Sequence, residues 1–466
     1  MDTANTKDAT ALAGPRLPAD QGLSSLGLIM QLVGSISLGL MAYLMLLPLF
    51  SGGAAGGWQM LLLGASGIIR AAFHRSAGGA LLYGGHATPR RALRTYLYVS
   101  IAETAIWVFV MLKTGVPVKT TIPMIAMLLS WPVTLTVVTS RPRFQAVLDE
   151  IPQSEDLGFE GAGVLMLILG LIGTLFSGFV LYAMLKLPGA VFSSPQALLV
   201  FGVFAMLVGR SVLQTIAGYR ATSGVSSDEA SDAAGRYFNF GVVSSVIAAG
   251  AVLVNLMMGM HYATSIMVGL VFVGFALCCL LIWPLLLRRF YTERNFSVLL
   301  AGDESGGQRR VPDTGMTTLG WILLGSAVYG LSSAVPHLLL GTGSGDPFGI
   351  FFGAGLMGEG QASPWWQIGI AGVELWAGIE LINMSDRYRI AATIYGLAAA
   401  AATLFIAWPM IKNGLGGSEV FALGRQSSMF KLIAQAGIAV GLVIPVVTII
   451  LANRKITPQA TARIKS

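Results

Sequence analysis

Five ionisable residues lie inside apolar stretches that are long enough to cross a lipid bilayer. These residues are Arg70, Glu103, Arg210, Glu374 and Glu380. An ionised group at the bilayer centre costs roughly 2.5–3.5 kcal/mol on insertion scales, so such groups pair with one another, bind ions or relay protons. They are therefore the residues of this chain whose type and position point most directly to chemistry.

Depth in the bilayer predicts which of these charges meet. Counted along each stretch at about 1.5 Å per residue, Arg70 and Glu103 lie at similar depths on adjacent antiparallel stretches, so we expect an ion pair. Arg210 has no carboxylate on its own neighbours, and Glu380 lies at a comparable depth elsewhere in the chain. We therefore predict a pair between Arg210 and Glu380. The alternative for both arginines is that their long side chains extend to the headgroups.

Glu374 is left without a predicted partner. It lies thirteen residues before Arg387, close to the middle of the bilayer, and six residues from Glu380. An unpaired carboxyl group at that depth is suited to binding a proton or a cation, as in many transporters. The alternative is a structural carboxyl group, either protonated or bonded to Gln214, Asn255 or Gln435.

Other chemistry has little support in the sequence. His74 and His337 could in principle bind haem or a metal ion, but no paired spacing accompanies them. Cys278 and Cys279 are adjacent within an apolar run and do not form a metal site. No phosphate-binding loop, zinc-protease motif or nucleophile elbow is present, so we predict no catalytic residue, no metal and no cofactor.

Composition identifies the elements that position these residues. Hydrophobic residues make up 55% of the 466 residues, charged residues make up 11%, and the mean hydropathy is +0.73. A soluble domain carries about 25% charged residues, so this chain belongs in a membrane. Twelve spanning helices are predicted, at 27–50, 57–77, 94–114, 121–140, 161–185, 194–218, 236–258, 263–287, 317–340, 365–386, 390–411 and 430–452.

Basic residues predict the orientation of these spans. Of the 29 Lys and Arg residues, 21 fall on one side of the membrane and 6 on the other, while Arg70 and Arg210 lie within spans. This asymmetry predicts a multi-pass protein of the plasma (inner) membrane with both termini in the cytoplasm. Because the net charge of +7 is distributed over helix ends, nucleic acid is not an expected partner.

Repeated features predict three tandem copies of a four-helix unit, all in the same orientation. Prolines recur in the fourth span of each unit, as Pro132, Pro284 and Pro445, where they mark the fold or act as hinges. Arginines stand eight residues before a glycine at Arg70 and Arg210. The predicted class is an all-α polytopic bundle with a disordered tail at 1–26, units at 27–155, 156–312 and 313–456, and a second tail at 457–466.

Two functions are compatible with this architecture. The first is a transporter or channel-like protein that is coupled to protons or cations through Glu374, with the Gly-rich external segment 341–364 as a gate, a lid or a re-entrant element. The second is a non-catalytic structural or assembly subunit of a larger membrane complex, because the spans contain few polar groups. The expected partners are the lipid bilayer and either other membrane subunits or further copies of this chain.

Overall fold

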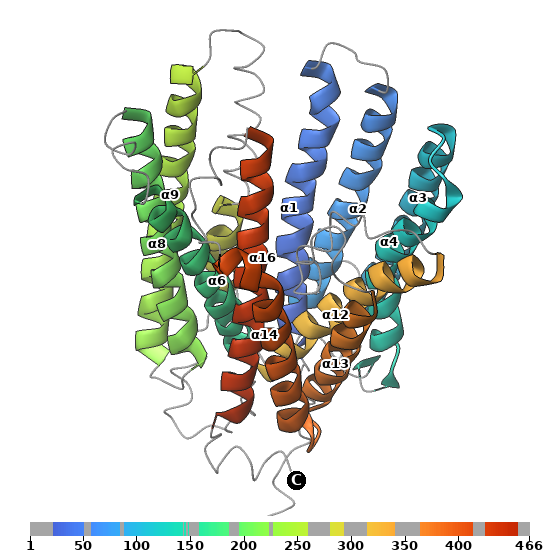
Figure 1. The fold of residues 1–466 in the computed structure, drawn as a ribbon. Helices are drawn as coiled ribbons and strands as arrows, with labels where there is room; N and C mark the ends of the chain where they lie inside the picture. Colours follow the sequence, from blue (N-terminus) through green and yellow to red (C-terminus); the bar gives the residue numbers. More distant parts are fainter. Residues whose placement is uncertain are drawn as a thin grey trace, which may run out of the picture.

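The computed structural model describes residues 22–50, 57–83, 88–142, 144–145, 148, 158–185, 195–222, 227–259, 280–292, 315–340, 364–412 and 425–454. All regular structure in these ranges is α-helical, as predicted (Figure 1). The helices are α1 (Leu23–Phe50), α2 (Gly57–Tyr83), α3 (Pro89–Lys113), α4 (Val118–Thr139), α6 (Phe159–Leu185), α8 (Pro195–Thr222), α9 (Ser227–Gly259), α12 (Met316–Leu340), α13 (Pro364–Asn383), α14 (Tyr388–Lys412) and α16 (Arg425–Asn453). Residues 280–292 form a further helical segment.

The predicted spans overlap these helices, with differences at their ends. The helix α9 begins at Ser227, nine residues before the predicted start, because its polar first turns lack the hydropathy of a span. Of the predicted span 263–287, only residues 280–287 lie in the described part. The Gly-rich segment 341–363 and the tails before residue 22 and after residue 454 lie outside it.

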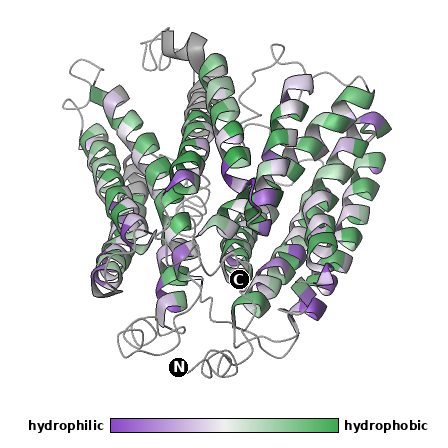
Figure 2. Cartoon of the chain, turned by 90° about the horizontal axis from the view of Figure 1, so that it is seen from below, coloured by the Kyte–Doolittle hydropathy of each residue, from purple (hydrophilic) through white to green (hydrophobic). Residues whose placement is uncertain are grey.

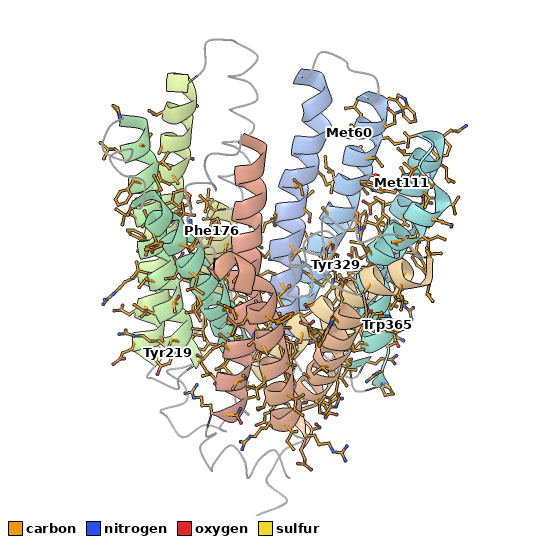
Figure 3. The ribbon with its side chains drawn as sticks, viewed as in Figure 1. Met60, Met111, Phe176, Tyr219, Tyr329 and Trp365 are labelled. Atoms are coloured by element: carbon orange, nitrogen blue, oxygen red, sulfur yellow. The ribbon has the colours of Figure 1, made fainter. Side chains whose placement is uncertain are left out.

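Length and hydropathy identify the chain as a membrane protein. In the described residues, seven helices are long and apolar enough to cross a bilayer, including Phe159–Tyr182 and Ala197–Thr222. Large hydrophobic side chains also point outward, and Phe405 is 83% exposed. Hydrophobic residues cover most of each helix in Figure 2, and aromatic side chains such as Tyr219 and Trp365 project from the outside of the bundle in Figure 3. An apolar surface of this extent, on helices of this length, indicates contact with a lipid bilayer.

Glycine allows three pairs of helices to approach closely. The pairs are α1 with α2, α6 with α8, and α12 with α13, and each has two facing glycines whose added Cβ atoms would lie within about 3.3 Å of the opposite carbonyl oxygen. The three glycine pairs are Gly27 with Gly78, Gly163 with Gly218, and Gly320 with Gly378. Apolar burial does not drive helix association in lipid, so this close backbone contact supplies van der Waals attraction.

A glycine in the left-handed conformation precedes the first helix of each of these pairs. Gly22, Gly158 and Gly315 have φ angles of +77°, +68° and +70°. Each carbonyl oxygen accepts a hydrogen bond from the backbone N–H four residues later, so all three helices begin in the same way. Side chains are strongly disfavoured at such φ values, which explains the residue type.

The hydrophobic core consists of three clusters that join neighbouring groups of helices. One lies among α1–α4 and includes Trp321 of α12, and a second lies among α12, α13, α14 and α16 and includes Val164 of α6. The third lies among α6, α8, α9 and residues 280–292 and includes Leu28 of α1. Each group of four helices thus packs against the first helix of another group. In Figure 1, α8 and α9 lie on one side of the bundle and α3 and α4 on the opposite side.

Candidate functional site

Three prolines each remove a backbone N–H from a helix, and polar side chains bond the carbonyl groups left without a donor. Proline cannot donate to the carbonyl four residues earlier, so Pro132, Pro284 and Pro445 free the carbonyls of Leu128, Leu280 and Gly441. In lipid an unsatisfied carbonyl group costs several kcal/mol. The three carbonyls accept hydrogen bonds from Arg70 Nη2 at 2.7 Å, from Arg210 Nη2, and from Thr403 Oγ1 at 3.0 Å, respectively.

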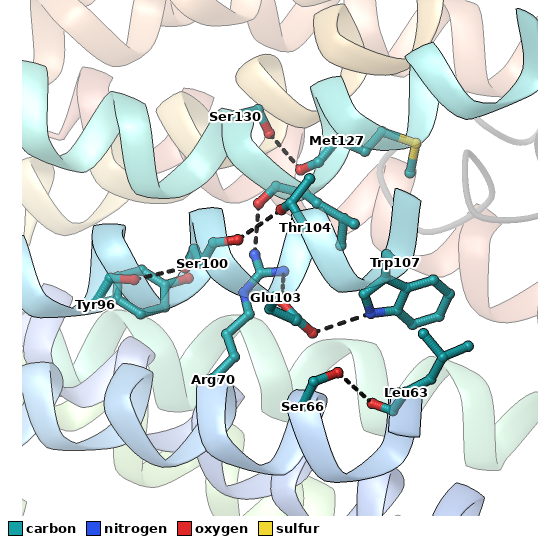
Figure 4. A network of polar contacts seen from close by, with 11 residues as sticks. Leu63, Ser66, Arg70, Tyr96, Ser100, Glu103, Thr104, Trp107, Met127 and Ser130 are labelled. Carbon is teal, nitrogen blue, oxygen red and sulfur yellow. Dashed lines mark hydrogen bonds and ion pairs between the residues drawn. The ribbon is translucent and has the colours of Figure 1, made fainter. Parts of the chain in front are cut away.

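The predicted ion pair between Arg70 and Glu103 is confirmed (Figure 4). Arg70 Nη1 lies 2.7 Å from Glu103 Oε2, and the Glu103 side chain is 5% exposed. Trp107 Nε1 donates to the other carboxylate oxygen at 3.3 Å. The guanidinium group therefore joins α2 to both α3 and α4, which is a structural role.

The predicted pair between Arg210 and Glu380 is wrong. Arg210 Nη1 donates to Ser245 Oγ at 2.8 Å, and Nη2 donates to the carbonyl of Leu280. Glu380 accepts hydrogen bonds from Trp376 Nε1 at 3.2 Å and from Ser385 Oγ. The prediction failed because matching depth was treated as sufficient, whereas the carbonyl freed by Pro284 lies on a helix next to Arg210.

The second helix of each glycine pair carries polar residues at matching positions. Arg70 and Arg210 lie eight residues before Gly78 and Gly218, but the residue eight before Gly378 is Ile370. Four residues before the same glycines stand His74, Gln214 and Glu374, whose exposed fractions are 7%, 5% and 6%. The third group of helices therefore has a carboxyl group but no arginine.

Glu374 forms no ion pair with any residue that the structure describes, but its carboxyl group does accept a hydrogen bond. The Tyr395 hydroxyl, on α14, donates to Glu374 Oε1 at 3.2 Å, and Ser326, on α12, lies beside the carboxyl group. The alternative partner Gln214 has an amide nitrogen without a partner in the part of the chain that the structure describes. The side chains of Asn255 and Gln435 lie outside that part.

A small cavity adjoins this carboxyl group. Its volume is about 20 Å³, and it is lined by Ser326, Ile370, Glu374, Tyr395, Ala399, Thr403, Val440, Gly441, Ile444 and Pro445. One water molecule needs at least about 10–15 Å³ measured in this way, so the cavity holds about one water or one small ion. Its polar wall consists of oxygen atoms from one carboxyl group and three hydroxyl groups, a donor set suited to a hard cation or a proton.

The remaining candidates do not form a metal or haem site in the described residues. The His74 ring stacks on the Tyr96 ring with centroids 4.8 Å apart and an interplanar angle of 14°. No group of three or more His, Cys, Asp or Glu residues with metal-binding proximity occurs within the described ranges. The side chain of His337, together with Cys278 and Cys279, falls outside those ranges.

Comparison with protein-family models, with curated proteins and with solved structures found no match to this chain. The functional argument therefore rests on the residues themselves. Sequence reasoning identified Glu374 but missed Tyr395, Ser326 and Thr403, which surround it. Glu374 stands four residues before Gly378, as His74 and Gln214 stand four residues before the corresponding glycines. This shared spacing was the signal in the sequence that Glu374 faces the interior of the bundle.

Proposed function

We propose that this protein is a transporter whose activity is coupled to a proton or a monovalent cation bound at Glu374. The observation that carries this proposal is a buried carboxyl group facing a cavity of about 20 Å³ between α12, α13, α14 and α16. Intramembrane carboxyl groups without a basic partner typically mark ion or proton pathways. A single carboxylate balances one positive charge, which favours a proton or a monovalent cation over a divalent one.

Pro445 in α16 indicates that the helix can move next to the cavity beside Glu374. Arginine donors with a full charge bond the freed carbonyls of Leu128 and Leu280. In α16 the donor is the single hydroxyl of Thr403, which also lies 2.8 Å from the carbonyl oxygen of Ala399. Charged hydrogen bonds are about twice as strong as neutral ones, so α16 is held least firmly at its proline. A shift of α16 would open or close the cavity, because Gly441 and Pro445 line it.

We further propose that the chain consists of three tandem four-helix units with twelve spans and with both termini in the cytoplasm. The equivalent glycine contacts, the left-handed glycine before each first helix, and the repaired proline carbonyls support three copies. In this scheme the first two units are stabilised by arginines and have a scaffold role. The third unit has exchanged the arginine for Ile370 and carries the ion site.

Charge movement in reconstituted membranes tests the ion site. Wild-type protein on a solid-supported membrane should give a transient current after a jump in pH or in Na⁺ concentration. Glu374→Gln should remove that current, because glutamine cannot take up a proton or balance a cation. The matched control Glu380→Gln changes a carboxylate on the same helix that is bonded to Trp376 and Ser385, and it should keep the current.

Two results would contradict the proposal. A wild-type current that persists in Glu374→Gln would exclude this carboxyl group as the coupling site. If the wild type gives no current after either jump, the transporter proposal fails. Native mass spectrometry of gently extracted protein would then test the alternative function, since stoichiometric foreign subunits are expected of an assembly subunit and not of an independent transporter.

A further inference from the structure

Basic residues that follow the three prolines in sequence lie near the end of the second helix in a neighbouring group. The guanidinium carbon of Arg289 lies 5.2 Å from the centre of the Tyr83 ring, at the end of α2. Arg454 donates a hydrogen bond to the carbonyl of Thr222, the last residue of α8. At two of the three contacts between groups, an arginine therefore contacts the neighbouring group, through a cation–π contact for Arg289 and a hydrogen bond for Arg454.

The third contact differs from the other two. Arg141 follows Pro132 by nine residues, as Arg454 follows Pro445, but its exposed side chain makes no hydrogen bond or ion pair with any residue that the structure describes. A cavity of about 200 Å³ lies between α4 and the helices α12 and α13. Its lining includes Val138, Arg141, Leu324, Val328 and Asn383.

The lining of this cavity is amphipathic in the way a membrane lipid is. Most of its walls are Val, Leu and Ile side chains, while Arg141 and Asn383 stand at helix ends, where α4 and α13 finish. Typical small-molecule pockets have volumes of about 300–1,000 Å³. This cavity is smaller, so it accommodates a segment of one acyl chain and not a whole ligand. A basic residue beside such a cavity matches the known pattern for anionic headgroups between spanning helices.

We propose that this cavity, between α4 and the helices α12 and α13, binds one anionic phospholipid. Its acyl chain packs against Val138, Leu324 and Val328, and its phosphate accepts hydrogen bonds from Arg141. The lipid replaces the protein contact that Arg454 makes at the corresponding place. This site is independent of the proposed transport at Glu374, because no residue lines both cavities.

Native mass spectrometry of the intact chain with added phosphatidylglycerol or phosphatidylcholine tests the site. The wild type should retain one phosphatidylglycerol that phosphatidylcholine does not replace. Arg141→Gln should weaken this binding about fivefold, the effect of one arginine on an anionic lipid. Val328→Phe should also weaken it, because the added ring fills the space for the acyl chain. Arg454→Gln is the matched control and should retain the lipid as the wild type does.

The controls keep the result interpretable. Size-exclusion chromatography and helical circular dichroism identify variants that fail to fold, and Arg141→Gln, at an exposed position, should fold normally. Equal retention of the two lipids, or unchanged phosphatidylglycerol binding in Arg141→Gln, would overturn the proposal. Unchanged binding in folded Val328→Phe would also overturn it, because the acyl chain would then lie outside this cavity.

Discussion

Arginine repair of a proline-freed carbonyl predicts a measurable coupling between Arg210 and Pro284. Arg210→Met leaves the partly buried carbonyl of Leu280 without a donor and removes the bond to Ser245. Leaving a buried acceptor unsatisfied costs about 1–3 kcal/mol, so the expected loss of unfolding free energy is about 2–3 kcal/mol. In a Pro284→Ala background the alanine N–H can bond Leu280, and the same change should cost about 1–2 kcal/mol less.

The assay is a double-mutant cycle on unfolding in mixed detergent micelles. The cycle cancels the intrinsic cost of placing Arg210 in an apolar phase, because that cost enters both arms equally. Arg210→Met in a Pro445→Ala background is the control, since Thr403 bonds the carbonyl freed there, and the two changes should be additive within about 0.5 kcal/mol. Additive losses in the Pro284→Ala cycle as well would refute the proposed repair.

Three further predictions concern packing, the ion pair and cofactors. Gly218→Leu should destabilise the protein by about 1–3 kcal/mol or more in thermal unfolding, because its Cβ would overlap the backbone of α6. Gly209→Ala is the control and should be nearly neutral, because a Cβ at that position meets open space. Glu103→Ala should cost about 3–5 kcal/mol in the same measurement, since it leaves the charge of Arg70 without its partner. Arg70→Ala should then cost less in the Glu103→Ala background than in the wild type, and equal costs in the two backgrounds would contradict the pairing. The His74 ring is stacked on a tyrosine inside the core, so His74 should not bind haem, and a Soret band in the wild type that is lost in His74→Ala would contradict that reasoning.

Properties that depend on local composition were predictable from the sequence. A bilayer imposes a length of about twenty apolar residues on a span, so hydropathy located the helices α1 and α6 to within a few residues. The Arg70–Glu103 pair was also predictable, because both residues lie on adjacent antiparallel helices and a short connection limits their alternatives. Proline lacks a backbone N–H, so each helix proline leaves the carbonyl four residues earlier without its usual donor. The need for another hydrogen-bond donor at that carbonyl therefore followed from the sequence.

Which donor meets each carbonyl was decided only by tertiary structure. Arg210 and Arg70 occupy matching positions, yet a depth count paired Arg210 with Glu380, since depth is one coordinate and the angular position of a helix in the bundle is another. The same ambiguity concealed Tyr395 as the partner of Glu374.

The sequence by itself determined that the chain is a helical membrane protein and where its prolines interrupt backbone bonding, and it placed Glu374 within an apolar stretch. Tertiary structure decided which side chains surround that carboxyl group and that a cavity remains beside it. The physical reason is that hydropathy and hydrogen-bonding capacity belong to individual residues, whereas cavities and partners depend on how α12, α13, α14 and α16 are rotated against one another.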